Sequence, residues 1–63
     1  MKSKTQMIVE WLKEGKGKNL VEEHKEEWKI YGRERIIEDL MMFLCLTKGY
    51  AVGVAIEVEK MIG

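Results

Sequence analysis

The sequence predicts a small all-α domain of three or four helices, with residues 1–63 forming a single unit. Two observations carry this prediction. Apolar residues recur at helical spacing along most of the chain, and glycines stand where helices would end. A third observation concerns stability: a chain of this length hides only about 60% of the surface that its unfolded form exposes. One cysteine excludes a disulfide within the chain, so oligomerisation is the expected source of added stability.

The first helix is expected from Lys4 to Glu14. Ser3 and Gln6 have the spacing of a capping box, in which each side chain bonds the backbone NH of the other residue. The apolar positions of this helix recur at helical spacing: Met7, Ile8, Trp11 and Leu12. Residues 15–18 read G-K-G-K and are expected to form a flexible loop. They lack the spacing and the hydroxyl residue of a phosphate-binding loop.

A second helix is expected to start at Asn19 and to end at Gly32. Asn19 is a favourable N-cap, and Glu22 follows it by three positions. One face of this helix is mainly apolar: Leu20, Val21, His24, Trp28 and Tyr31. Only Gly32 separates this helix from the next, so we expect the chain to turn a corner there.

The most apolar part of the chain lies in residues 33–48. Its apolar stripe is Ile36, Ile37, Leu40, Met41, Phe43 and Leu44. Glu34, Arg35, Glu38 and Asp39 take the other side, but Met42, Cys45 and Leu46 make the second half apolar all round. Such a helix is usually buried on several sides, and this short chain has little else to cover it. We therefore expect a partner there.

Residues 50–62 fit two periods. The valines alternate with small or acidic residues, as in a half-buried strand, while Ala51, Val54, Ala55 and Val58 follow helical spacing. A strand would have no pairing partner within the chain, because no other segment alternates. We prefer a helix, with a short strand paired to a second copy as the alternative.

The charge balance and the hydropathy of the chain limit which partners and which cell compartment are expected. The 11 basic and 11 acidic side chains cancel, so no overall field attracts nucleic acid. Residues 1–18 nevertheless carry five lysines and two glutamates, whereas residues 19–31 carry four glutamates and two lysines. No membrane span is expected, because Lys48 interrupts the longest apolar window. No secretory signal is expected either, because no apolar stretch of the required kind follows the N-terminal lysines. A free cysteine then suggests the cytoplasm.

No enzyme, cofactor or metal site is expected. His24 lies in an apolar stripe and Cys45 in an apolar run, where packing is the better interpretation for both. One histidine and one cysteine do not make a set of zinc ligands. Trp11 and Trp28 are expected in the core, with an exposed binding anchor as the alternative.

Over residues 4–58 the order of elements resembles the outline of helix-turn-helix and winged-helix DNA-binding domains. The resemblance implies that Arg33 and Arg35 begin a recognition helix and that Lys16 and Lys18 touch phosphates. It rests on no specific motif, and Glu34, Glu38 and Asp39 share the face of the arginines.

Two functions therefore follow from the sequence. The first is a non-enzymatic module that binds protein, most simply a second copy of itself, and so occupies a partner's surface. Its expected contacts come from the central stretch and the C-terminal segment: Met42, Cys45, Leu46, Val54 and Val58. The alternative is a small regulator of transcription that binds double-stranded DNA.

Overall fold

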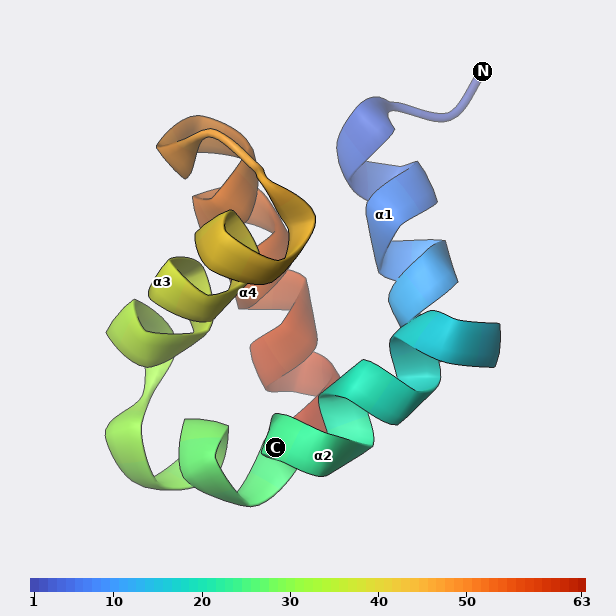
Figure 1. Ribbon diagram of the computed structural model, residues 1–63. Coiled ribbons are helices and arrows are strands. Elements are labelled where there is room, and N and C mark those ends of the chain that lie inside the picture. Colours follow the sequence, from blue (N-terminus) through green and yellow to red (C-terminus); the bar gives the residue numbers. More distant parts are fainter.

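The computed structural model describes residues 1–63 and consists of four helices without a strand. They are α1 (Lys4–Lys13), α2 (Gly15–Tyr31), α3 (Arg33–Leu44) and α4 (Lys48–Ile62). In Figure 1, α3 and α4 pack side by side, α1 stands apart from α3, and α2 crosses the lower end of the molecule. The all-α class is confirmed, and the C-terminal segment is a helix.

All four helices contribute to one core. Its largest fully buried side chains are Leu12, Trp28, Ile36, Leu40, Val54 and Val58. From α4 the buried positions are Ala51, Val54, Ala55, Val58 and Ile62, which follow the helical period. The alternating valine pattern is thus overridden, because a helix satisfies its own backbone hydrogen bonds and still buries one apolar stripe.

The beginning of α1 agrees with the sequence prediction. Gln6 Oε1 accepts a hydrogen bond of 2.9 Å from the Ser3 backbone NH, and Ser3 Oγ accepts one of 3.1 Å from the Gln6 backbone NH. These two bonds complete the capping box and satisfy donors that the first turn leaves free. The helix ends at Lys13, one residue before the predicted end.

The predicted start of the second helix was wrong. Residues 15–18 are the first turn of α2 and not a loop, and Asn19 lies inside the helix and does not cap it. Gly15 has a φ of 66°, a conformation that allows the sharp turn from α1. Gly17 is buried where α2 crosses α1, and a Cβ added there would lie 2.7 Å from the carbonyl carbon of Trp11. The glycines therefore serve the close packing of two helices.

The corner at Gly32 is confirmed, with a φ of 85° that favours glycine. The next helix is shorter than the apolar stretch suggested, because α3 ends at Leu44 and Cys45 adopts the left-handed conformation, with φ 53° and ψ 38°. Leu46 then lies in the connection to α4, whose N-cap is Thr47. Cys45 and Leu46 therefore do not extend the helical surface of Met42.

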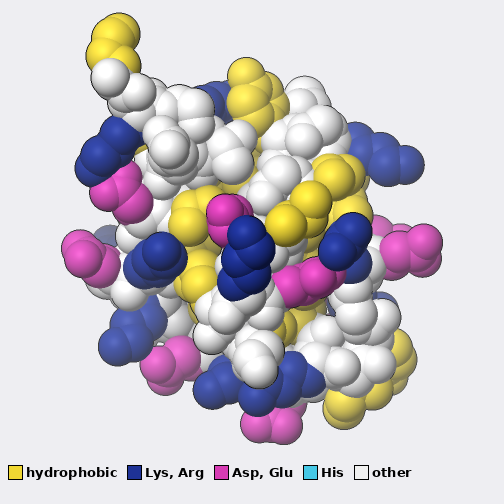
Figure 2. Space-filling view, turned by 180° about the vertical axis from the view of Figure 1, so that it is seen from behind, with side chains coloured by type: hydrophobic (Ala, Val, Ile, Leu, Met, Phe, Trp, Pro, Cys, Tyr) yellow, Lys and Arg dark blue, Asp and Glu magenta, His cyan; other side chains and the backbone are white.

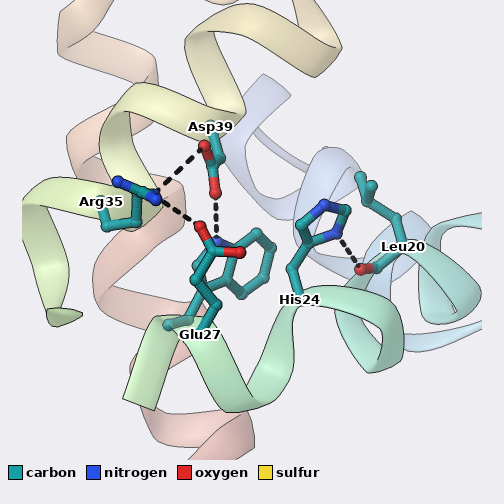
Figure 3. A network of polar contacts seen from close by, with 6 residues as sticks. Leu20, His24, Glu27, Arg35 and Asp39 are labelled. Atoms are coloured by element: carbon teal, nitrogen blue, oxygen red, sulfur yellow. Dashed lines mark hydrogen bonds and ion pairs between the residues drawn. The ribbon is translucent and has the colours of Figure 1, made fainter. Parts of the chain in front are cut away.

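A buried polar contact joins α2 to α3 (Figure 3). The Trp28 indole Nε1–H donates a 2.7 Å hydrogen bond to Asp39 Oδ2. Asp39 is only 6% exposed, so its expected place on the solvent face was wrong. Arg35 lies between Glu27 and Asp39, at 2.7 Å from the first carboxylate and 4.0 Å from the second. The polar end of the buried indole is thus fully satisfied.

Candidate protein-binding surface

An apolar groove lies between α1 and the end of α3. It has a volume of about 480 Å³, and six of its seven lining residues are hydrophobic. Lys4, Met7, Ile8 and Trp11 line it from α1, and Leu44, Cys45 and Leu46 line it from the end of α3 and the following connection. Figure 1 shows the two elements that border it, α1 and the yellow end of α3. No acidic side chain lines it.

The walls of the groove are partly open to solvent. Met7 is 55% exposed and Trp11 is 44% exposed, although both are large apolar side chains. They lie four residues apart and so project from the same face of α1. Exposed aromatic and methionine side chains of this kind are typical of protein-binding surfaces, where tryptophan anchors and methionine adapts.

Lys4 provides the only charge in the groove lining. Its Nζ lies 4.5 Å from the centre of the Tyr50 ring, a cation–π contact that bridges α1 and α4. It forms no ion pair with a carboxylate of the chain. The groove therefore combines an apolar floor with an unpaired positive charge at its edge.

The opposite face of the molecule is different in character. Figure 2 shows lysine, arginine, aspartate and glutamate side chains dispersed over it, with small apolar areas between them. A second hollow of about 360 Å³ lies between α1 and Glu57, and only one of its seven lining residues is hydrophobic. The groove is thus the more suitable of the two surfaces for an apolar ligand.

The residues predicted to form the protein interface lie in three different places in the structure. Cys45 and Leu46 lie in the groove. Met42 is 67% exposed but lies outside the groove lining. Val54 and Val58 have no exposed surface, so they belong to the core of the single chain and are removed from the proposed contact. Burial in α4 followed from the helical period, which the alternating valines had obscured.

The sequence predicts no surface role for four groove residues: Lys4, Met7, Ile8 and Leu44. It places the three apolar ones on the apolar stripes of their helices and Lys4 at the first position of the first helix. Trp28 is 1% exposed, in agreement with a core role, whereas Trp11 is half exposed and fits the alternative of a surface anchor. The signal in the sequence is a six-residue window of α1 with five apolar residues: Met7, Ile8, Val9, Trp11 and Leu12. That is more apolar surface than one face of a ten-residue helix needs for packing.

The two arginines considered for DNA contact are both held by carboxylates of the same chain. Arg33 donates to both carboxylate oxygens of Glu59, at 2.7 and 3.2 Å. This hydrogen bonding raises the pKa of Arg33 and lowers that of Glu59. Arg35 donates to Glu27, and that bond raises the pKa of Arg35. A phosphate or a base edge would have to displace these carboxylates.

The remaining candidates lie apart from the arginines. Lys16 and Lys18 are exposed in the first turn of α2, whereas Arg33 and Arg35 begin α3. His24 is half-buried, with Nδ1 3.0 Å from the Leu20 carbonyl oxygen. Its ring lies between those of Trp28 and Phe43, at centroid distances of 5.7 and 4.9 Å. This is a packed histidine that ties α2 to α3.

No cluster of three or more histidine, cysteine, aspartate or glutamate residues could hold a metal ion. None of the four helices has the length and apolar character needed to cross a membrane. The chain matches no known protein-family model, no curated protein and no solved structure.

Proposed function

We propose that this protein is a small protein-binding module that acts by occupying the surface of its partner and does not transform a substrate. The observation that carries the proposal is the groove between α1 and the end of α3. In a chain whose residues are 35% charged, six of the seven residues that line this groove are hydrophobic. A contiguous exposed apolar surface of this kind is typical of interaction sites.

The groove has the features of a binding site with a central anchor. Trp11 supplies a rigid aromatic surface, Met7 an adaptable one, and Leu44 and Leu46 form the opposite wall. An apolar segment of a partner would cover these side chains and exclude water from them, which is the main favourable contribution to association. Because Cys45 lies exposed in this site, we also propose a reducing compartment, the cytoplasm.

Cys45 allows a direct test because it is the sole cysteine and lies in the groove. A photoactivatable cross-linker attached to Cys45 is expected to give a protein adduct of discrete mass in the host cell. The matched control moves the cysteine away from the groove, as Cys45→Ser with Lys25→Cys on the side of α2 that lies beside Ile62, and is expected to give no such adduct. Met7→Glu, which places a charge on the groove wall, is expected to abolish the adduct at Cys45.

The contrary result is equally clear. If Cys45 yields no protein adduct, or if the Lys25→Cys control gives the same adducts, the groove is not a protein-binding site. Far-ultraviolet circular dichroism of the labelled chains checks that each variant keeps its helices, so that a lost adduct is not a lost fold.

A further inference from the structure

The outer face of α2 is acidic and ends in exposed apolar side chains. Glu23, Glu26 and Ile30 are spaced by three and four residues and so lie on one face of the helix. Ile30 is 74% exposed and the adjacent Tyr31 is 62% exposed. Neither glutamate forms an ion pair within the chain. The Arg35 guanidinium packs over the Tyr31 ring, 4.8 Å from its centre, and leaves Ile30 as the most exposed apolar side chain here. This end of α2 is therefore an exposed apolar tip, the acidic tip, with two unpaired carboxylates on the same face as Ile30.

The acidic tip and the groove complement each other in both polarity and charge. The tip offers Ile30 as its apolar anchor, with the Tyr31 ring beside it, and the groove offers an apolar lining about 480 Å³ in volume. The two unpaired glutamates outweigh the exposed Lys29 next to Ile30, so the net charge of the tip is negative, while the groove lining contains Lys4 and no acidic residue. Opposite charges at the rim of an apolar contact select the partner and its orientation.

We infer that the groove binds the acidic tip of α2 from a second copy of this chain. The inference rests on the proposed function and names the partner. In a twofold symmetric pair, each copy would insert its Ile30 into the groove of the other, with the Tyr31 ring at the edge of the contact and Glu23 and Glu26 close to Lys4 of the partner copy. Such an arrangement is self-complementary, because every contact occurs twice.

A stable interface needs more area than the groove alone supplies, which favours a pair in which each copy makes two contacts. Specific interfaces cover about 800 Å² on each partner, close to a fifth of the 4423 Å² surface of this chain. A groove alone is a small part of such an area. A symmetric pair buries the groove and the acidic tip of each copy together, and it covers the exposed apolar side chains of both regions at once.

Charge reversal with rescue tests the pairing by sedimentation equilibrium of the purified chain over about a hundredfold range of concentration. The unaltered chain is expected to reach the mass of two copies. Lys4→Glu and the double variant Glu23→Lys with Glu26→Lys are each expected to raise the dissociation constant by about tenfold or more. Combining all three substitutions restores opposite charges and is expected to return the constant towards its original value.

Two features keep this experiment decisive. Lys4→Glu removes the cation–π contact with Tyr50, but it places an acidic residue in the first turn of α1, which has none and where the helix dipole favours it. Far-ultraviolet circular dichroism checks that the variant keeps its helices. Lys25→Glu is the matched control: the lysine is exposed, lies on the opposite side of α2 beside Ile62, and is expected to leave association unchanged.

Three outcomes would overturn the inference. These are a single-copy mass at every concentration, a mass that keeps growing beyond two copies, and charge variants that weaken association without rescue by the combination. A single-copy mass together with a Cys45 adduct to a different protein would leave the proposed function standing and remove only the second copy as partner.

Discussion

The Trp28–Asp39 hydrogen bond is the one buried polar contact that holds α2 against α3, and it leads to a residue-level prediction. Asp39→Ala leaves the indole NH buried without an acceptor and is expected to lower the free energy of unfolding by about 1–3 kcal/mol. Asp39→Asn keeps an acceptor oxygen and is expected to lower it by less than half as much. Urea unfolding followed by tryptophan fluorescence measures both. Equal losses would show that the carboxylate charge matters more than the hydrogen bond.

This residue also shows a limit of pattern-based reasoning. A carboxylate on a helix is assigned to solvent because burying it alone is unfavourable. Asp39 is buried because an indole NH from another helix and the Arg35 guanidinium both face it. Arg35 lies four residues before Asp39 on the same helix, a spacing visible in the sequence. The indole comes from the packing of α2 on α3, which no spacing along the sequence specifies. Ile36 and Leu40 were placed correctly, since apolar burial needs no particular partner.

At the scale of the helices, the start of α2 at Gly15 predicts whether Asn19→Ala raises or lowers the free energy of unfolding. If Asn19 capped a helix, Asn19→Ala would lower the free energy of unfolding by about 1 kcal/mol. Asn19 instead lies exposed inside α2, where alanine is the better helix former, so the substitution is expected to raise that free energy by several tenths of a kcal/mol. Ser3→Ala, which removes a true cap, is the control and is expected to lower it by about 0.5–2 kcal/mol. Thermal unfolding distinguishes the two cases.

The contact between α1 and α2 gives a second prediction at this scale. Gly17→Ala would bring a Cβ to 2.7 Å from the carbonyl carbon of Trp11, so the two helices must move apart. A loss of about 1–3 kcal/mol in the free energy of unfolding is expected, despite the higher helix propensity of alanine. Gly49→Ala meets nothing within 4 Å and is the matched control, with an expected gain of up to about 1 kcal/mol. A gain at both positions would show that α1 does not pack tightly on α2.

The helix boundaries show which local sequence signals are enough to predict where a helix begins or ends. The capping box at Ser3 and the glycine at position 32 were interpreted correctly, because each satisfies backbone groups within a few residues. The start of α2 was missed because Gly15 and Gly17 suggest a loop, whereas one forms a sharp turn and the other a close helix crossing. The end of α3 was missed because Cys45, a residue that rarely adopts positive φ, takes the left-handed conformation.

At the scale of the whole molecule, the groove could not be located from the sequence. The apolar surplus was recognised, and Cys45 and Leu46 were assigned to it, but its other wall comes from α1, nearly forty residues earlier. The helical period of α1 says which residues share a face and not which neighbour covers them. Because α1 packs on α2 and α4 and leaves the end of α3 uncovered, Met7 and Trp11 remain exposed. The proposed binding surface thus lies where the contact between two elements is incomplete.

Pairing of two copies would also link stability to concentration, which gives a prediction for the molecule as a whole. Only the folded chain has a formed groove, so association stabilises the folded state by an amount that grows with concentration. Over a hundredfold increase in concentration, the midpoint of thermal unfolding is expected to rise by about 5 °C or more. In Lys4→Glu the midpoint is expected to depend much less on concentration, because the weakened pair is less populated. A midpoint that stays constant in the unaltered chain would mean that the folded chain is stable alone, and the exposed groove would then be available to a different protein.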